Sequence, residues 1–250
     1  MCFNMSIIRE IEELQSEFRA EFRKTPALDS SSLQLYHKSG FSHPHWPVIC
    51  ADDPGRITMV RWGLIPHWIR DRDAALAIRN KTLNARGETL HRLPSFRASF
   101  PHSTCLVLAD GFFEPFHYRG TSYPFYIHAQ SGTPLTLGGI YSDWRDPVTG
   151  TTYRSFSVIT VPAVGIIDTI HHAKHRMPLI LAPESRSAWL AREESGKRRE
   201  LVRPLIPEPL AAYPVARAIY SRSQDTNTPQ MLEPVRYGIP AVDNLIADSA

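Results

Sequence analysis

Residues 104–141 read TCLVLADGFFEPFHYRGTSYPFYIHAQSGTPLTLGGIY, and this stretch decides the fold. It holds three apolar runs of strand length, and Arg119-Gly and Ser131-Gly are turn signals between them. Similar runs lie before and after it. The strand candidates of the whole chain are Val48–Cys50, Thr58–Trp62, Thr104–Leu108, Phe125–His128, Leu135–Tyr141, Ser155–Val161 and Leu179–Leu181. Short strands separated by turns predict a mainly antiparallel β core.

Two further segments have a helical pattern. Apolar side chains recur at helical spacing across residues 7–24, and residues 184–200 begin with two candidate N-caps, Ser185 and Ser187. We therefore predict an α+β fold, a single compact domain with a mainly antiparallel β core and peripheral helices. The domain is expected to cover residues 1–240, and residues 241–250 are expected to form a loose C-terminal tail.

The composition is that of a globular protein with a mild positive charge. The chain has 250 residues, of which 42% are hydrophobic, and its net charge is +3, which permits a polyanionic partner without requiring one. Between residues 61 and 97, eight basic side chains oppose three acidic ones. This strip is either a phosphate-contacting surface or a solvated basic face. The three cysteines form no CxxC pair, so the sequence indicates neither a disulfide framework nor a zinc ribbon.

Cys2 is the most informative single residue. Methionine aminopeptidase removes Met1 when the next side chain is small, which would leave Cys2 with a free α-amine beside its thiol. The amine would have a pKa of about 8 and the thiol is a strong nucleophile at neutral pH. An aldehyde would form a Schiff base with the amine, and the thiol would then close a five-membered thiazolidine. The alternative is an ordinary frayed terminus.

Two polar or aromatic segments lie in the basic strip. The tryptophans of Trp62-Gly-Leu-Ile-Pro-His-Trp68 could stack on nucleic-acid bases or could be core aromatics. In Leu83-Asn-Ala-Arg-Gly-Glu-Thr89, Arg86 could clamp a phosphate with Glu88 orienting it, or the segment could be a polar helix cap.

Two segments later in the chain carry titratable side chains. Glu114 follows two phenylalanines, where desolvation would raise its pKa and suit it to general acid–base work; an exposed carboxylate at a strand end is the alternative. His171, His172 and His175 lie together with Lys174. The i, i+4 spacing of His171 and His175 would suit a metal on a helix, but no HExxH is present, and an acid–base histidine beside a basic strip fits better.

Taken in chain order, these segments resemble the SRAP family, the SOS-response-associated peptidases or abasic-site-shielding proteins. The matching blocks span roughly residues 1–182 and are Met1-Cys-Phe-Asn, Trp62-Gly-Leu-Ile-Pro, Asn84-Ala-Arg-x-Glu-Thr, Cys105-Leu-x-x-x-Asp-Gly-Phe-Phe-Glu and Ile170-His…Arg176-Met-Pro. The resemblance implies covalent capture and shielding of abasic sites in single-stranded DNA through the Cys2 thiazolidine, with slow self-reversal.

The resemblance also implies roles for individual residues. Cys2, Asn84, Glu114 and His171 would be catalytic: Asn84 would hold the linkage or the amine, Glu114 would act as general acid and base, and His171 would stabilise the opened sugar. His175 is the alternate histidine and His172 a weaker one. The residues expected to contact DNA are Arg86, Trp62, Pro66 and Trp68. No cofactor and no metal are expected, and the activity would be that of an abasic-site processing enzyme of lyase or hydrolase type.

Three positions depart from the family pattern: Asn4 stands where many members carry an Arg, Pro115 where a Trp is common, and Thr160-Val-Pro-Ala-Val lacks an Asn often seen there. Two other functions stay open, a thiol (auto)peptidase that uses Cys2 and a non-covalent single-stranded DNA-binding protein. No apolar stretch approaches membrane-spanning length. We expect a soluble monomer in the cytoplasm that associates with the nucleoid when it engages single-stranded DNA.

Overall fold

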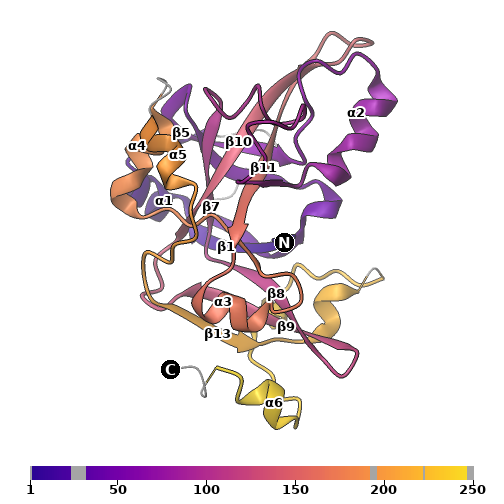
Figure 1. Ribbon diagram of the computed structural model, residues 1–250, viewed down its shortest axis with the longest axis vertical. Helices are drawn as coiled ribbons and strands as arrows, with labels where there is room; N and C mark the ends of the chain where they lie inside the picture. Colours follow the sequence, from indigo (N-terminus) through magenta and orange to yellow (C-terminus); the bar gives the residue numbers. More distant parts are fainter. Residues whose placement is uncertain (1, 24–31, 192–195, 222, 247–250) are drawn as a thin grey trace.

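Two β-sheets make the frame of the protein, shown one above the other in Figure 1. The computed structural model describes residues 2–23, 32–191, 196–221 and 223–246. The upper sheet has the strand order β12-β11-β10-β7-β4-β5-β2, with β6 beside β11, and the lower sheet has the order β13-β9-β8-β1-β3. These sheets and the few short helices around them confirm the predicted α+β class with its antiparallel core.

The upper strands are β2 (Glu21–Phe22), β4 (His45–Cys50), β5 (Asp53–Trp62), β6 (Asn84–Arg86), β7 (Thr104–Ala109), β10 (Leu135–Arg145), β11 (Thr152–Pro162) and β12 (Arg176–Pro178). The lower strands are β1 (Asn4–Glu10), β3 (Ser32–Ser39), β8 (Gly111–Tyr118), β9 (Thr121–Ala129) and β13 (Leu210–Pro214). The helices are α1 (Ile11–Phe18), α2 (Arg72–Ile78), α3 (Gly165–Ile170), α4 (Arg186–Leu190), α5 (Gly196–Leu201) and α6 (Pro240–Asp243). Short 3₁₀ turns are η1 (Gly40–Ser42), η2 (Arg79–Lys81), η3 (Pro183–Ser185), η4 (Arg217–Tyr220) and η5 (Pro229–Leu232).

The upper sheet closes on itself. Its strands β11, β10, β7, β4 and β5 are neighbours in that order, and β5 pairs back with β11 in parallel where Arg61 faces Ser155 and Trp62 faces Phe156. Closure removes free strand edges and leaves an interior that side chains must fill. The fully buried rings of Trp62 and Phe156 stack there, with centroids 6.0 Å apart.

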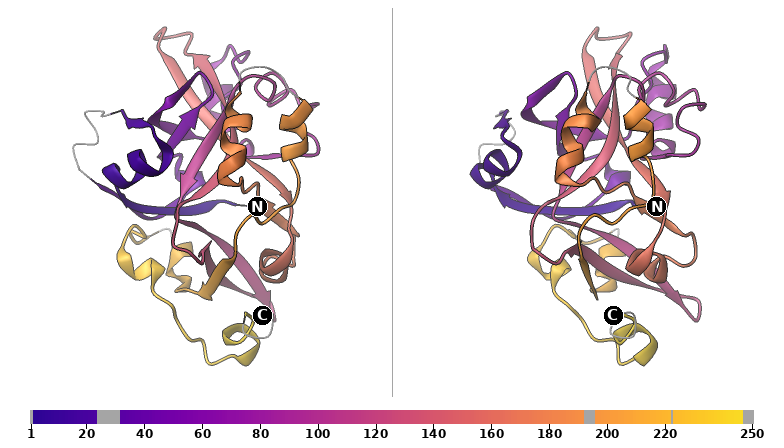
Figure 2. Two further views of the ribbon diagram at one scale, coloured as in Figure 1. Left: turned by 90° about the vertical axis from the view of Figure 1, so that its left-hand side faces the viewer. Right: turned by 60° about the vertical axis from the view of Figure 1, so that its left-hand side comes forward.

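The chain passes from the upper to the lower sheet at Asp110, between β7 and β8. The Asp110 carboxylate accepts a hydrogen bond from the Ile8 amide at 2.7 Å and one from Arg9 Nε at 2.6 Å, both on β1. Gly111 follows, and a Cβ there would lie 2.5 Å from the Ile127 carbonyl oxygen, so the two strands can approach this closely only with glycine. This junction fixes β1 across the middle of the molecule in all three views (Figures 1 and 2).

The helix predicted over residues 7–24 was wrong in its first part. Residues 4–10 form strand β1, and the helix covers only residues 11–18, with residue 24 outside the described part of the chain. The β-branched pair Ile7 and Ile8 lies on opposite faces of the strand, one buried and one 37% exposed. Tertiary pairing of β1 with β3 and β8 therefore overrides the helical spacing of the apolar residues.

Other boundaries also differ from the prediction. Strands β2, β3, β6, β8 and β13 were not predicted. The strand expected at Leu179–Leu181 was wrong, because β12 covers Arg176–Pro178 and Ile180 makes only an isolated bridge to Leu137. The helix predicted over residues 184–200 is divided into α4 and α5, and residues 192–195 between them lie outside the described chain. Ser185 is at the N-cap of α4 without a capping hydrogen bond from its side chain.

The segment expected to be a loose tail from residue 241 is packed on the domain as far as it is described. Val242 of α6 is fully buried, and the Asp243 carboxylate accepts hydrogen bonds from the Tyr237 amide at 2.9 Å and the Ile239 amide at 3.1 Å. Residues 247–250 lie outside the described chain. Among the helices of the described ranges, none is both long enough and apolar enough to cross a membrane.

Candidate active site

Cys2 lies two residues before the start of β1 and is fully buried. Its backbone carbonyl oxygen accepts a hydrogen bond of 2.9 Å from Nδ2 of Asn84. Asn84 begins β6, which pairs in parallel with β11 so that Asn84 faces Val158. The other amide atom, Asn84 Oδ1, is buried and has no hydrogen-bond partner among the described residues. A buried acceptor in this position is suited to a donor that arrives with a ligand or with a newly freed amine.

Glu114 comes from the other sheet, on β8, where it faces Phe125 of β9. Its side chain is only 1% exposed. This burial raises the pKa of the Glu114 carboxyl to about 7, because a carboxylate loses its hydration inside the protein. The alternative of an exposed carboxylate at a strand end is therefore wrong. A carboxyl that titrates near neutral pH can both give and take a proton.

His171 caps α3 and lies against Glu114. Its Nδ1 is 3.2 Å from Glu114 Oε2 and 2.8 Å from the carbonyl oxygen of Arg176. Because a carbonyl oxygen only accepts, Nδ1 carries the proton. Burial lowers the pKa of His171 to about 4, so the imidazole is neutral near pH 7 and its close contact with Glu114 is not an ion pair.

The other two histidines of the cluster lie elsewhere. The His175 side chain is 63% exposed, and its Nδ1 is 2.6 Å from the Asp168 carboxylate. The ring of His172 packs edge-on against Phe116, with centroids 5.1 Å apart. The structure thus brings His171, and neither of its neighbours, to Glu114. No group of three or more His, Cys, Asp or Glu side chains in the described ranges is arranged to hold a metal ion.

A cavity of about 280 Å³ opens in front of Glu114 and His171, lined also by Phe3, Asn4, Lys174 and Tyr220. The motif analysis did not single out Tyr220, which comes from a 3₁₀ turn far along the chain and has no local motif. Lys174 was noticed only as part of the histidine cluster. Its ammonium group supplies a positive charge at the mouth of the site.

The Cys2 thiol is held in its protonated form. Burial, and the nearby charge of Glu114, raise the pKa of the Cys2 thiol well above its usual range. A thiol in this state is a poor first nucleophile at neutral pH, because the thiolate is the reactive form. An amine on the same residue would therefore react first, and the thiol second.

Asn4 and Pro115, two of the departures from the family pattern, are both ordered in the structure. Asn4 Oδ1 is 3.1 Å from Nε2 of the buried His37, whose Nδ1 is 2.8 Å from Thr226 Oγ1. Pro115 faces Pro124 across β8 and β9. Asn4 is thus held as part of a polar chain at the edge of the cavity.

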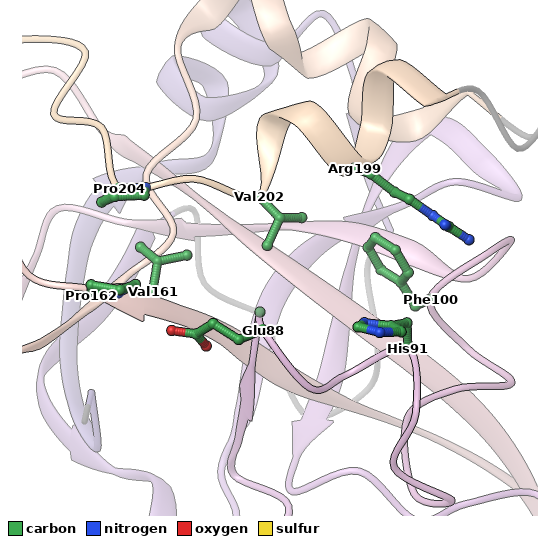
Figure 3. Close-up of a pocket in the computed structure, with 9 residues that line it drawn as sticks. Glu88, His91, Phe100, Val161, Pro162, Arg199, Val202 and Pro204 are labelled. Carbon is green, nitrogen blue, oxygen red and sulfur yellow. The ribbon is translucent and has the colours of Figure 1, made fainter.

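Glu88 pairs with Arg176 and not with Arg86, which corrects the expected partnership. Arg176 Nη2 is 3.0 Å from Glu88 Oε2 and 3.1 Å from Thr160 Oγ1, and Arg176 Nη1 also contacts the Glu88 carboxylate. Arg86 is exposed. Beside this pair lies an open cavity of about 380 Å³ whose wall is largely apolar, with Val161 and Pro162 on one side and Phe100 beside His91 on the other (Figure 3).

The prediction that Trp62 stacks on bases is wrong, because the side chain is fully buried. Its Nε1 donates a hydrogen bond of 2.9 Å to the Leu83 carbonyl oxygen, and its ring stacks on Phe156. Trp62 is a core aromatic that supports the start of β6. Pro66 is also buried. Trp68 is 48% exposed, with Nε1 donating to the Pro94 carbonyl oxygen at 3.1 Å, so a face of this ring is accessible.

Comparison with protein families matches residues 1–222 to the model described as SOS response associated peptidase (SRAP). Among curated proteins, the chain is 32% identical over 213 residues to the abasic site processing protein HMCES of Gallus gallus, covering 76% of this chain and 61% of that protein. It is 28% identical over 239 residues to the abasic site processing protein YoqW of Bacillus subtilis, covering 93% of this chain and 99% of that one. The chain thus spans about six tenths of the length of the animal relative.

Solved structures show the same fold. A crystal structure of a protein from Bacteroides thetaiotaomicron has a TM-score of 0.86 and 30% sequence identity, covering 94% of this chain and 100% of the other. A protein from Bordetella bronchiseptica has a TM-score of 0.69 at 23% identity, covering 86% of this chain and 100% of the other, and shows similarity of fold alone.

Proposed function

Because the chain belongs to the SRAP family, we propose that it captures abasic sites in single-stranded DNA by a covalent bond to Cys2. The observation that carries the proposal is the meeting of Cys2, Asn84, Glu114 and His171, which come from four separate segments, at one buried place beside a cavity. The relatives' names, abasic site processing proteins, support abasic sites as the substrate.

The reaction begins at the amine. Removal of Met1 frees the α-amine of Cys2, whose nitrogen attacks the C1′ aldehyde of the ring-opened abasic sugar. The resulting carbinolamine loses water to give a Schiff base. The Cys2 sulfur then adds to the same carbon while its proton passes to the nitrogen, which closes the thiazolidine. One water leaves overall, and no oxidant, reductant or cofactor takes part.

Glu114 and His171 move the protons in this proposal. The carboxyl of Glu114, with its pKa raised to about 7, can protonate the leaving hydroxyl of the carbinolamine and then accept the thiol proton. The neutral His171 hydrogen-bonds the opened sugar and keeps Glu114 in place from 3.2 Å. Asn84 anchors the residue through its carbonyl oxygen and offers Oδ1 to the amine. Reversal retraces these steps slowly, with Glu114 returning the proton to the sulfur as the C–S bond breaks and the Schiff base re-forms.

The second candidate is the thiol (auto)peptidase that the family description names. There Cys2 would attack a peptide carbonyl, and removal of Met1 would be the smallest case. The protonated state of the buried thiol disfavours this reaction, which needs a thiolate, and the thiazolidine route does not need one until the Schiff base has formed. The third candidate, non-covalent single-strand binding, would not require Cys2.

The test is to incubate the purified full chain with a single-stranded oligonucleotide that carries one abasic site, and to measure intact mass after denaturing electrophoresis. We expect a heat-stable adduct without borohydride, at the mass of the protein lacking Met1 plus the oligonucleotide less one water. Matched Cys2→Ser and Cys2→Ala variants should form no such adduct. If the wild type has lost Met1 and forms no adduct, the proposal is wrong; cleavage of a peptide by Cys2→Ser would favour the peptidase.

A further inference from the structure

A third cavity lies away from Cys2, where α2 meets the far end of the β10–β11 hairpin in the upper part of Figure 1. Its volume is about 280 Å³, and none of the residues that line it also lines the cavity in front of Glu114. A separate small apolar cluster of Ile65, Ile69, Ala75 and Trp144 packs beneath it and holds α2 against the hairpin. The cavity is thus a built part of the fold.

Two arginines of this cavity, Arg61 and Arg79, have no carboxylate partner among the described residues. The other two lining arginines are paired: Arg72 lies 3.7 Å from Asp146, and Arg154 forms bidentate contacts with Asp52 and Asp143. The Arg61 and Arg79 charges are close enough that burial, together with the Arg61 charge, lowers the pKa of Arg79. The positive charges of these two guanidinium groups repel each other in the empty cavity. A bound anion would lower the free energy by compensating both charges.

The Arg79 guanidinium also has an unused donor. Its Nε is buried and makes no hydrogen bond to any residue in the described ranges. The start of the Arg79 side chain packs closely against Gly63, where an added Cβ would lie 3.2 Å from the Arg79 Cβ. A buried, unpartnered N–H of this kind calls for an oxygen acceptor.

An accessible aromatic ring completes the cavity. Tyr153 stacks on Trp144, with centroids 6.1 Å apart and planes 27° apart, and is itself 39% exposed. Trp144 is fixed by a hydrogen bond of 2.6 Å from its Nε1 to the Ile69 carbonyl oxygen. Tyr153 therefore rests on a rigid ring on one side, and its exposed part can receive a flat ligand ring.

We propose that this cavity binds one nucleotide, with its phosphate on Arg61 and Arg79 and its base against Tyr153. Arginine forks match phosphate oxygens, and bases stack on aromatic side chains irrespective of sequence. The nucleotide is either free or part of a nucleic-acid strand, since both offer the same phosphate and base. The site does not depend on Cys2 chemistry, and its failure would leave the capture of abasic sites untouched.

The test uses calorimetric titration of the full chain with dAMP, deoxyadenosine and inorganic phosphate, and with an undamaged single-stranded oligo-dA. We expect dAMP to bind more tightly than either of its parts. Arg61→Gln and Arg79→Gln should each weaken nucleotide binding about tenfold, and Tyr153→Ala about fivefold. Arg70→Gln removes the same charge from an exposed position of the same strip outside the cavity and serves as the matched control, with a change below about twofold.

The titrations distinguish a site for free nucleotides from a site for nucleotides within a nucleic-acid strand. Weakened binding of both dAMP and oligo-dA assigns the site to free nucleotides and strands alike, and weakened binding of oligo-dA alone assigns it to a strand. Arg61→Lys and Arg79→Lys keep the charge and lose the fork, so they should fall between wild type and the Gln variants and stay folded. The proposal is overturned if the Gln variants bind both ligands as wild type does, if Arg70→Gln has the same effect, or if the wild type binds neither ligand.

Discussion

Nδ1 of His171 lies 3.2 Å from Oε2 of Glu114 and donates a hydrogen bond of 2.8 Å to the Arg176 carbonyl oxygen, so the backbone holds the ring against the carboxyl group. The hydrogen bond to the Arg176 carbonyl oxygen fixes the tautomer of His171 and holds its ring beside Glu114. The turn between His171 and Arg176 leaves the side chain of His175 exposed. This geometry predicts that His171, and not His175, is needed for adduct formation.

Replacement of His171 by Gln should slow adduct formation with abasic single-stranded DNA by at least about tenfold, because the neutral donor beside Glu114 is lost. His175→Gln is the matched control, since His175 is exposed and bound to Asp168, and it should change the rate less than about twofold. Single-turnover rates on denaturing gels measure both. Equal losses in the two variants would show that the histidine nearest Glu114 has no special role.

Glu114→Gln should stabilise the fold at high pH. The folded-state pKa of Glu114, about 7, is raised above that of an unfolded glutamate, so the native state binds more protons there and loses stability as pH rises from about 4.5 to 7. The full effect is on the order of 3 kcal/mol. His171, with its pKa lowered to about 4, acts oppositely between about pH 4 and 6.5, where rising pH stabilises the native state.

Urea unfolding at a series of pH values tests this. The difference in the free energy of unfolding between Glu114→Gln and wild type should grow in favour of the variant from about pH 5 to pH 8. His171 is present in both proteins, so its contribution largely cancels in the difference. A difference that does not change with pH would mean that Glu114 titrates near its ordinary value.

Cys2→Ala should abolish covalent capture while salt-sensitive binding of single-stranded DNA stays largely intact. The variant keeps the backbone carbonyl that Asn84 holds, so the N-terminal segment should remain in place. Gel analysis of the adduct and fluorescence anisotropy of a labelled oligonucleotide give the two readouts. A joint loss of both, with a lowered melting temperature, would indicate misfolding instead of lost chemistry.

Arg86→Ala should make the salt dependence of non-covalent DNA binding shallower, by about one in the slope of log K against log salt, because one phosphate contact releases fewer counterions. Arg86 is exposed and its strand is fixed beside β11, so the fold should not change. Arg92→Ala, another exposed arginine of the basic strip, shows whether the effect belongs to position 86. An unaltered slope for Arg86→Ala would make its role structural.

Trp62→Ala should destabilise the protein by about 3–5 kcal/mol, as expected when a buried aromatic leaves a cavity and an unpaired carbonyl oxygen. Trp68→Ala should cost less than about 1 kcal/mol, because the ring is half exposed, and should weaken single-strand binding if a base stacks on it. Thermal melting and anisotropy distinguish the two tryptophans. If the two variants lose the same amount of stability, Trp62 contributes no more to the core than the half-exposed Trp68.

The strands of the closed sheet were predictable because their apolar runs are short and bounded by turns, as at Thr104–Leu108 and Leu135–Tyr141. Strand β1 was not, since Ile7, Ile8 and Ile11 fit a helical spacing and only their pairing with distant strands selects the extended form. A local sequence pattern does not show which distant strands a segment will pair with, and this pairing decides whether the segment is extended or helical.

Sequence motifs identified Cys2, Asn84, Glu114 and His171 as candidate site residues. The structure adds that these four residues lie close together. Trp62 was assigned to DNA because a Trp beside Gly and Pro looks the same in a core as at a surface. Tyr220 had no motif, and Arg61 with Arg79 were only two members of a long basic strip. Their unpaired state depends on where carboxylates lie in space, which the sequence does not give.

The order of the site's residues along the chain has a consequence for synthesis. Cys2 is made first, whereas Asn84, Glu114 and His171, which surround it in the folded protein, follow much later. At about 5–20 residues per second, the delay between Cys2 and His171 is roughly ten to thirty seconds. During that interval the Cys2 thiol is on a nascent chain without the side chains that surround it in the folded protein, and the proposed site is assembled only when translation has passed two thirds of the sequence.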